Sequence, residues 1–131
     1  MLTAQETQQL LESAKSASEK TYSPYSGLAV GAAVLCENGL MYKGTNVENA
    51  SYGLTICAER SAICNAVSQG DTAIRAIAVY SPGAASIPPC GACRQFITEF
   101  GRDIVLLFNY EGQLVQTAIK DLLPFEFKFS Q

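Results

Sequence analysis

Stretches with helical periodicity alternate along this chain with short apolar stretches typical of β-strands. A first helix is expected to begin at Thr3, because Thr3 and Glu6 have the spacing of a capping box. Two further helices are expected over residues 57–67 and 90–100. The expected strands are residues 28–36, 40–47, 74–80, 104–108 and 114–118.

The order of these segments predicts a three-layer α/β/α domain. The turn Glu37-Asn38-Gly39 joins the first two strands and predicts a β-hairpin. The two later helices are long enough to connect parallel strands, whereas the short turns are not. We therefore expect one mixed sheet of roughly five strands with helices on its faces. The length of 131 residues predicts a single domain, residues 1–131.

The chain contains no histidine, and this limits its chemistry. Ser-His-Asp triads, Cys-His pairs and His-ligated metal sites are excluded. Nine Lys and Arg residues against twelve Asp and Glu residues give a net charge of −3 without a basic cluster, which disfavours nucleic-acid binding. No apolar run approaches the ~18 residues of a membrane span, and the first residues lack the pattern of a secretion signal. We therefore expect a cytoplasmic protein with neither a membrane nor a nucleic acid as partner.

The five cysteines divide into two groups. Cys36 and Cys64 lie in apolar periodic segments and are expected to be small buried core residues. Cys57 begins the sequence Cys-Ala-Glu, and Cys90 and Cys93 belong to Pro-Cys-Gly-Ala-Cys, each at an expected helix start. An odd number of cysteines in a chain without a secretion signal argues against a disulfide framework.

The second group has the residue types of a catalytic zinc site. Residues three apart in the first turn of a helix lie on the same side, so Cys90 and Cys93 can point at one metal ion. Cys57 from the other helix can be the third ligand, which leaves the fourth position of tetrahedral zinc for water. Glu59, two residues after Cys57, can move protons at the metal.

Two arginines adjoin the ligand segments. Three thiolates make bound zinc a weaker acid than three neutral imidazoles do, and a nearby positive group would restore some of that acidity. Arg60 and Arg94 are the candidates, and we expect both to contact the cysteine sulfurs. A lone CxxC pair is also typical of a structural zinc site or a redox pair, but a structural site normally has four ligands.

These motifs resemble those of the zinc nucleoside deaminases. Residues 57–59 (Cys-Ala-Glu) and 89–93 (Pro-Cys-Gly-Ala-Cys) carry this likeness. Residues 24–26 (Pro-Tyr-Ser), 30–33 (Val-Gly-Ala-Ala) and 46–52 (Asn-Val-Glu-Asn-Ala-Ser-Tyr) resemble the small homotetrameric cytidine deaminases specifically. The resemblance covers nearly the whole chain. It implies the cytidine deaminase fold and the hydrolysis of cytidine and deoxycytidine to uridine and deoxyuridine in pyrimidine salvage.

The resemblance also implies the reaction mechanism. Zn²⁺ is expected at Cys57, Cys90 and Cys93. Glu59 is expected to take a proton from zinc-bound water, and the hydroxide then attacks C4 of the base. Glu59 returns protons to N3 and to the amino group, so that ammonia leaves.

Further positions match residues that bind the nucleoside in this family. Asn46 and Glu48 match the partners of the ribose hydroxyls, and the backbone around Ala58 resembles the segment that reads the pyrimidine. Tyr52 and Phe127 match aromatic residues that reach the site of a neighbouring subunit. The resemblance therefore implies a small nucleoside substrate and a homotetramer with shared pockets.

Leu28 departs from the family pattern, because relatives usually carry a Phe there that stacks over the pyrimidine. Two alternatives therefore stay open: a deaminase of another aminopyrimidine nucleoside or nucleoside antibiotic, and a non-catalytic zinc-stapled module. A change in absorbance on mixing with cytidine distinguishes a cytidine deaminase from both alternatives. The alternation of Phe125, Phe127 and Phe129 predicts an edge strand or a core plug. Of the three, only Phe127 is also expected to have a role in the site.

Overall fold

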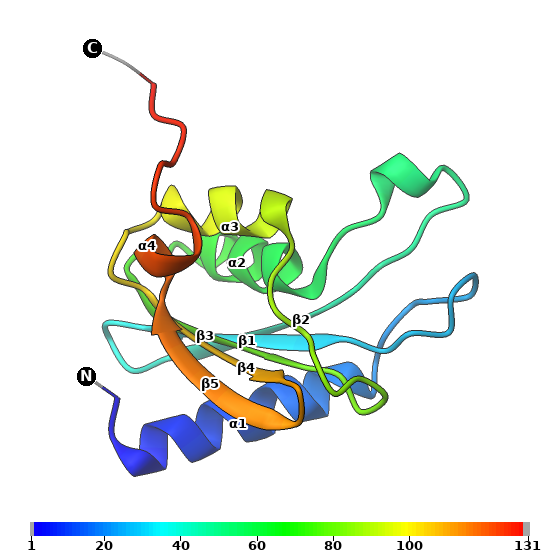
Figure 1. Ribbon diagram of the computed structural model, residues 1–131, viewed down its shortest axis with the longest axis horizontal. Helices are drawn as coiled ribbons and strands as arrows, with labels where there is room; N and C mark the ends of the chain where they lie inside the picture. Colours follow the sequence, from blue (N-terminus) through cyan, green and yellow to red (C-terminus); the bar gives the residue numbers. More distant parts are fainter. Residues whose placement is uncertain (1, 130–131) are drawn as a thin grey trace.

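A five-stranded mixed sheet lies at the centre of the structure, a computed structural model that describes residues 2–129 (Figure 1). The strands are β1 (Gly31–Cys36), β2 (Met41–Thr45), β3 (Ile74–Tyr80), β4 (Val105–Tyr110) and β5 (Gln113–Ala118). Their order in the sheet is β2-β1-β3-β4-β5. Only the β3–β4 pair is parallel among the described strands, so the predicted mixed sheet and its β1–β2 hairpin are confirmed.

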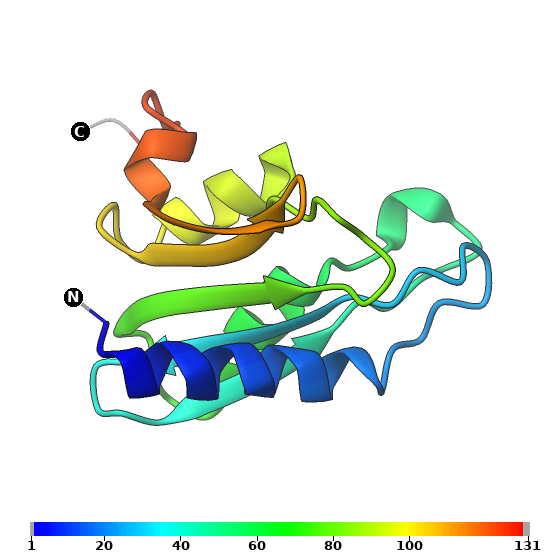
Figure 2. The ribbon, with the colours of Figure 1, turned by 60° about the horizontal axis from the view of Figure 1, so that its bottom comes forward.

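Helices cover both faces of the sheet, which confirms the predicted three-layer α/β/α architecture. Helix α1 (Ala4–Ser18) lies on one face, and α2 (Ala58–Ser68) and α3 (Gly91–Thr98) lie on the other (Figures 1 and 2). Helix α3 forms the crossover between the parallel strands β3 and β4. The structure adds a 3-10 helix, η1 (Tyr52–Leu54), and a short helix, α4 (Ile119–Leu122). Within residues 2–129, every helix is too short or too polar to cross a membrane.

Strand β1 is buried on both faces, which explains why its sequence is almost wholly apolar. Ala32, Val34 and Cys36 belong to the core between the sheet and the α2–α3 layer. Ala33 and Leu35 belong to the core beneath α1. A strand covered on both sides shows no alternation of polar and apolar residues, so its continuous apolar run, rather than a period, identified it in the sequence. The prediction that Cys36 is buried is confirmed.

Two glycines allow the helices to approach the sheet closely. A Cβ atom added at Gly31 would lie 2.0 Å from the backbone oxygen of Ala14 in α1. A Cβ atom added at Gly44 would lie 2.2 Å from the backbone nitrogen of Ala62 in α2. Only a residue without a Cβ fits such contacts, so α1 packs directly against the backbone of β1 and α2 against the backbone of β2.

Helix α1 begins with the predicted capping box. The Thr3 hydroxyl oxygen accepts from the Glu6 N–H at 3.0 Å, and the Glu6 carboxylate accepts from the Thr3 N–H at 2.9 Å. Both Glu6 carboxylate oxygens also accept from the guanidinium of Arg75 on β3, each at 2.9 Å. Arg75 and the Thr3 N–H together hold the pKa of Glu6 down at about 2. The pair connects the start of α1 to the sheet.

Two expectations, one about a strand boundary and one about burial, were wrong. The strand predicted from residue 28 begins at Gly31, and Leu28 lies in the preceding loop. Cys64 is exposed on α2, because the buried face of this helix is formed by Ala62, Ile63 and Ala66. A helix turns by about 100° per residue, so Cys64 lies about 200° around α2 from Ala62 and points away from the buried face.

The chain after α4 also differs from expectation, because residues 123–129 form neither an edge strand nor a core plug. Phe125, Phe127 and Phe129 are 94%, 76% and 88% exposed. The side-chain amide of Gln95 on α3 holds this tail. Gln95 donates to the Phe127 carbonyl oxygen and accepts from the Phe127 N–H, both at 3.0 Å.

Candidate active site and metal centre

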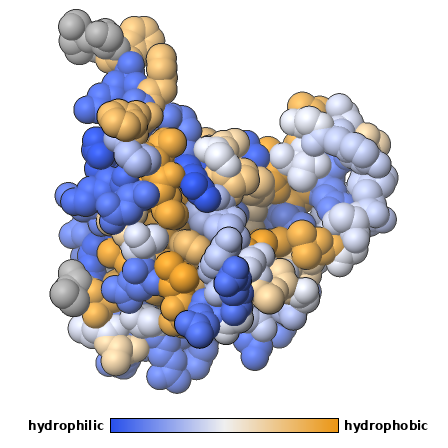
Figure 3. Space-filling view, viewed as in Figure 1, coloured by the Kyte–Doolittle hydropathy of each residue, from blue (hydrophilic) through white to orange (hydrophobic). Residues whose placement is uncertain are grey.

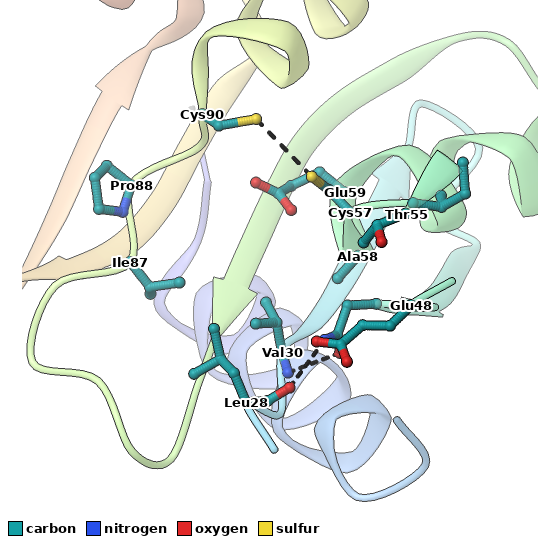
Figure 4. A pocket seen from close by; sticks show the side chains of 12 residues that line it. Leu28, Val30, Glu48, Thr55, Cys57, Ala58, Glu59, Ile87, Pro88 and Cys90 are labelled. Atoms are coloured by element: carbon teal, nitrogen blue, oxygen red, sulfur yellow. Dashed lines mark hydrogen bonds between the residues drawn. The ribbon is translucent and has the colours of Figure 1, made fainter. Parts of the chain in front are cut away.

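The starts of two helices bring the three predicted ligands together. Cys57 is the N-cap of α2, Cys90 is the N-cap of α3, and Cys93 lies in the first turn of α3. Their sulfur atoms all lie within 4.8 Å of one another, and those of Cys57 and Cys90 are 3.9 Å apart (Figure 4). Zn–S bonds of ~2.3 Å at tetrahedral angles separate two sulfurs by ~3.8 Å. The cluster therefore fits Zn²⁺ in both spacing and donor type.

Hydrogen bonds to the Cys57 sulfur stabilise its negatively charged thiolate form. A hydrogen bond from Cys93, followed by one from Arg60, lowers the pKa of Cys57 to about 5 despite its partial burial. The Arg60 Nη2 group donates to the Cys57 sulfur at 3.3 Å, as predicted. The pKa of Cys93 is raised by the same hydrogen bond and by burial. The cluster can thus present an anionic sulfur to a cation at neutral pH.

Arg94 does not make the predicted contact with a sulfur. Its Nε donates to the carbonyl oxygen of Pro89 at 2.9 Å, and its Nη1 donates to the carbonyl oxygen of Leu122 at 3.2 Å. The guanidinium therefore connects the loop before Cys90 to the end of α4. Proximity to Cys93 in the sequence was misleading, because neighbouring residues of a helix point in different directions.

Glu59 lies beside the cysteine cluster and is only 5% exposed (Figure 4). Burial raises the pKa of its carboxyl group to about 7, and the nearby Cys57 sulfur adds to the rise. A carboxyl group with such a pKa can both accept and donate a proton near neutral pH. It occupies the first turn of α2, two residues after the cysteine N-cap.

A cavity of about 240 Å³ opens beside Glu59. Among the described residues that line it, Glu48 and Glu59 are the only acidic ones, and none is Lys or Arg. The wall also includes residues that the sequence did not single out, Ile87 and Pro88, from the proline-rich loop before α3 (Figure 4). The predicted residues that line this cavity are Leu28, Asn46, Glu48, Cys57, Ala58, Glu59 and Cys90.

Asn46 and Glu48 reach the cavity from the segment that follows β2. Asn46 is buried, its amide group donates to the Leu28 carbonyl oxygen at 2.9 Å, and its Oδ1 accepts from the Val30 N–H at 3.0 Å. The Glu48 carboxylate accepts from the backbone N–H and the hydroxyl group of Ser26. Both side chains are therefore fixed by the loop before β1. Their predicted contact with a sugar stays a prediction.

Tyr52 and Phe127 are not among the residues that line the cavity beside Glu59. Tyr52 is 76% exposed and packs edge-on against Tyr25, with ring centroids 6.1 Å apart. These two tyrosines line a second cavity, which shares Glu48 and Thr55 with the first. The segment with η1 and the C-terminal tail project on opposite sides of a hollowed surface (Figure 3).

Comparison with known proteins gives consistent matches. Residues 4–108 match the family described as the cytidine and deoxycytidylate deaminase zinc-binding region. The chain is 44% identical over 121 residues to a cytidine deaminase of Sporosarcina psychrophila, which covers 91% of this chain and 89% of the relative. It is 33% identical over 131 residues to a blasticidin-S deaminase of Bacillus cereus, which covers 92% and 94% of the two chains.

A solved structure extends this match to the whole fold. The crystal structure of a cytidine deaminase from Burkholderia pseudomallei superposes with a TM-score of 0.87 at 42% identity. The superposition covers 96% of this chain and 100% of that one. The resemblance found in the motifs is confirmed by these matches and by the cysteine cluster. The chain belongs to the family of zinc-dependent cytidine deaminases.

Proposed function

We propose that this protein hydrolyses cytidine to uridine and deoxycytidine to deoxyuridine, with release of ammonia. The observation that carries the proposal is the buried Glu59 carboxyl group beside a three-cysteine cluster at a cavity of about 240 Å³. Zinc at the cluster supplies a Lewis acid that makes water nucleophilic at neutral pH. The cytidine deaminases among the relatives support the same reaction.

Glu59 carries the protons of this reaction. The overall change breaks the C4–N bond of the base and forms a C4–O bond, so water and cytidine give uridine and ammonia. Glu59 accepts a proton from the attacking water and delivers protons to N3 and to the departing amino group, as in the known zinc deaminases. Its burial beside the cavity supports this role. Arg60 stabilises the negative charge on Cys57 through its hydrogen bond to the sulfur.

The charges of the site favour a nucleoside over a nucleotide. The family also includes enzymes that act on deoxycytidylate, which carries a phosphate group. Phosphate is usually bound by Arg, Lys or clustered N–H donors. The described residues around the cavity and its neighbour beside Tyr52 include Glu48 and no Lys or Arg. An ionised Glu48 would repel a phosphate at this position.

Contacts with the nucleoside are divided among four residues of the same cavity wall. Asn46 and Glu48 hold the sugar hydroxyls, and the backbone at Ala58 reads the pyrimidine. Leu28 covers the base with an aliphatic side chain where relatives have Phe. Their common position on the wall of one cavity supports this division.

A second candidate substrate is another aminopyrimidine nucleoside or a nucleoside antibiotic. Two observations favour this second candidate: the 33% identity to a blasticidin-S deaminase and the presence of Leu28 in the cavity wall. Leu28 does not provide the aromatic face that would contribute ~0.5–1.5 kcal/mol of stacking. The chemistry at Glu59 and the cysteines would be the same for either substrate.

We also propose a homotetramer of single-domain chains, residues 1–131, with shared sites. The exposure of Tyr52 and Phe127 supports their contribution to the site of a neighbouring subunit. Pyrimidine salvage and a cytoplasmic location stay predictions from the sequence.

A substrate panel tests the proposed function. Ammonia release is measured with cytidine, deoxycytidine, deoxycytidine 5′-phosphate, blasticidin S and free cytosine. We expect turnover of the first two. We expect very little turnover of deoxycytidine 5′-phosphate, because an ionised Glu48 would repel its phosphate, and very little of cytosine, because it lacks the remote sugar contacts that contribute to the rate as well as to affinity. Efficient hydrolysis of free cytosine would contradict the nucleoside assignment. Turnover of blasticidin S alone would establish the second candidate.

A further inference from the structure

The hydroxyl group of Ser26 lies between Glu48 and the backbone of the loop before β1. It donates to Glu48 Oε2 and accepts from the Leu28 N–H at 3.0 Å. The other carboxylate oxygen, Oε1, accepts from the backbone N–H groups of Tyr25 and Ser26, at 3.0 and 3.1 Å. The Glu48 carboxylate is therefore held by three donors, and the Ser26 hydroxyl is the only side chain among those three.

Hydrogen bonds extend this connection to Asn46. The Leu28 carbonyl oxygen accepts from the Asn46 amide group at 2.9 Å, and Asn46 Oδ1 accepts from the Thr21 hydroxyl. The backbone N–H and C=O groups of Leu28 thus connect the Ser26–Glu48 pair to Asn46. Glu48 and Leu28 line the cavity beside Glu59 (Figure 4), and Asn46 lines the same cavity.

We propose that Ser26 is a positioning residue for nucleoside binding, which fixes the Glu48 carboxylate in the orientation that receives the sugar hydroxyls. The inference rests on the proposed function, because it takes Glu48 as a sugar-binding residue. The Leu28 N–H occupies one lone pair of the Ser26 hydroxyl and so leaves its proton for Glu48. Glu48 is therefore ordered before a substrate arrives, and binding does not bear that entropic cost.

The electrostatics of Glu48 agree with this role. The hydrogen bond from the Ser26 hydroxyl is the main interaction that lowers the pKa of the Glu48 carboxyl group, followed by the two backbone N–H donors. An ionised carboxylate accepts strong hydrogen bonds from hydroxyl groups. Ser26 therefore stabilises the form of Glu48 that binds a sugar hydroxyl best.

The loop has supports that are independent of the Ser26 side chain. The Gly27 N–H donates to the Ser23 carbonyl oxygen at 3.0 Å, and Asn46 holds the Leu28 carbonyl oxygen. Gly27 has a positive φ of 73°, a conformation that suits glycine. Ser26 is itself exposed, so its substitution leaves the core intact. Replacement of Ser26 by Ala thus removes one hydroxyl group without removing the loop's own turn.

The test compares cytidine with 2′,3′-dideoxycytidine, which lacks both ring hydroxyls of the sugar. We expect Ser26→Ala to raise the KM for cytidine about tenfold, the effect of losing a hydrogen bond to a charged group. The kcat/KM for dideoxycytidine should change less than twofold. Ser26→Thr should restore the cytidine KM because it restores the hydroxyl. Ser23→Ala, in the same loop, is the matched control and should leave both substrates unaffected.

The outcomes separate this inference from the proposed function. An unchanged cytidine KM in Ser26→Ala, or an equal loss with both substrates, would overturn the positioning role of Ser26 while cytidine deamination stands. A wild-type protein without cytidine turnover would overturn the proposed function. A Glu48→Gln protein with wild-type kinetics would overturn the sugar role of Glu48 and with it this inference. Zinc content and thermal unfolding of each variant show that the site and the fold are retained.

Discussion

Glu59 has a position that is unfavourable for folding and favourable for catalysis. Burial of an acidic side chain costs stability, and the rise in its pKa to about 7 reflects that cost. Carboxyl groups with raised pKa values that face a cavity are typical of proton carriers. The sequence predicted its place beside the metal ligand Cys57, but burial depends on packing of α2 against the sheet. The burial of Glu59 is therefore seen only in the structure.

Substitution of the ligands tests the metal site at the level of single residues. We expect about one zinc per chain in the wild-type protein, measured by elemental analysis of protein not exposed to chelators. Cys57→Ala, Cys90→Ala and Cys93→Ala should each lose most of the metal. Cys64→Ser is the matched control, because Cys64 is exposed on α2 outside the cluster. Retention of zinc after loss of Cys90 would contradict the ligand assignment.

Arg60 and Arg94 show the limits of prediction for single side chains. Both follow a ligand cysteine directly or closely, and both were expected to contact sulfur. Arg60 does so at 3.3 Å, whereas Arg94 binds the carbonyl oxygens of Pro89 and Leu122. Sequence proximity to a cysteine cannot distinguish them, because Arg94 turns towards the backbone of the preceding loop and of Leu122, which is 28 residues away. Ser26 and Gln95 were missed for the same reason: each holds atoms distant in sequence.

Gly44 determines how closely α2 packs on β2, and substitution there should damage the fold. A Cβ at this position would meet the Ala62 backbone at 2.2 Å, and backbone cannot move aside like a flexible side chain. We expect Gly44→Ala to lower the free energy of unfolding by at least about 1–3 kcal/mol, measured by urea titration. Gly83→Ala is the control, because no atom lies within 4 Å of its added Cβ. Equal stability of the two variants would contradict this packing.

The Glu6–Arg75 pair connects α1 to β3 and should make stability depend on pH. The folded-state pKa of Glu6, about 2, lies below its ordinary value of 4.5. The stabilisation is therefore complete above about pH 4.5 and is lost as the pH falls towards 2. Glu6→Gln keeps a capping oxygen but removes the charge, so it should lower the Tm at pH 7 and have less effect at pH 3.

The control for this pair is Glu12→Gln, which removes an exposed charge from the same helix. The Tm difference between wild type and Glu12→Gln should stay nearly constant over that pH range. A Tm difference for Glu6→Gln that does not shrink in acid would show that the pair does not stabilise the fold.

The main elements followed from the sequence because each has a strong local signal. The capping box at Thr3 marked α1, and apolar runs marked the strands. The C-terminal tail was missed because its contacts have no period: Gln95 binds the backbone of Phe127 and leaves its ring exposed. Alternating phenylalanines suggested a strand, but residues 123–129 do not join the sheet.

At the scale of the whole molecule, the exposed aromatic residues favour the proposed assembly with shared sites. The C-terminal phenylalanines and Tyr52 present large apolar side chains to solvent. Patches of exposed apolar groups, such as the phenylalanines of the tail, are typical of surfaces that bind another protein. A second copy of this chain would cover them, in agreement with the proposed homotetramer. The family resemblance predicted this assembly, whereas periodicity and composition alone gave no sign of it.

The assembly predicts a specific role for Phe127. We expect a mass of four chains by light scattering, and we expect Phe127→Ala to reduce kcat/KM for cytidine at least about tenfold, as for a central aromatic contact of an interface. Phe125→Ala is the matched control and should have a smaller effect. The zinc content should be unchanged in both variants. A monomeric wild-type protein with full cytidine activity would contradict the shared site.

The most direct test of zinc-dependent deamination is the rate of cytidine hydrolysis by Glu59→Gln, measured beside the wild-type protein at equal zinc content. The amide fills the same space but cannot move a proton, so the cysteine cluster and the fold should be retained. Loss of general acid and base catalysis by a residue that serves several steps should reduce the rate by about 10⁴-fold or more. A zinc-loaded Glu59→Gln protein that retains a tenth of the wild-type rate would contradict the assignment.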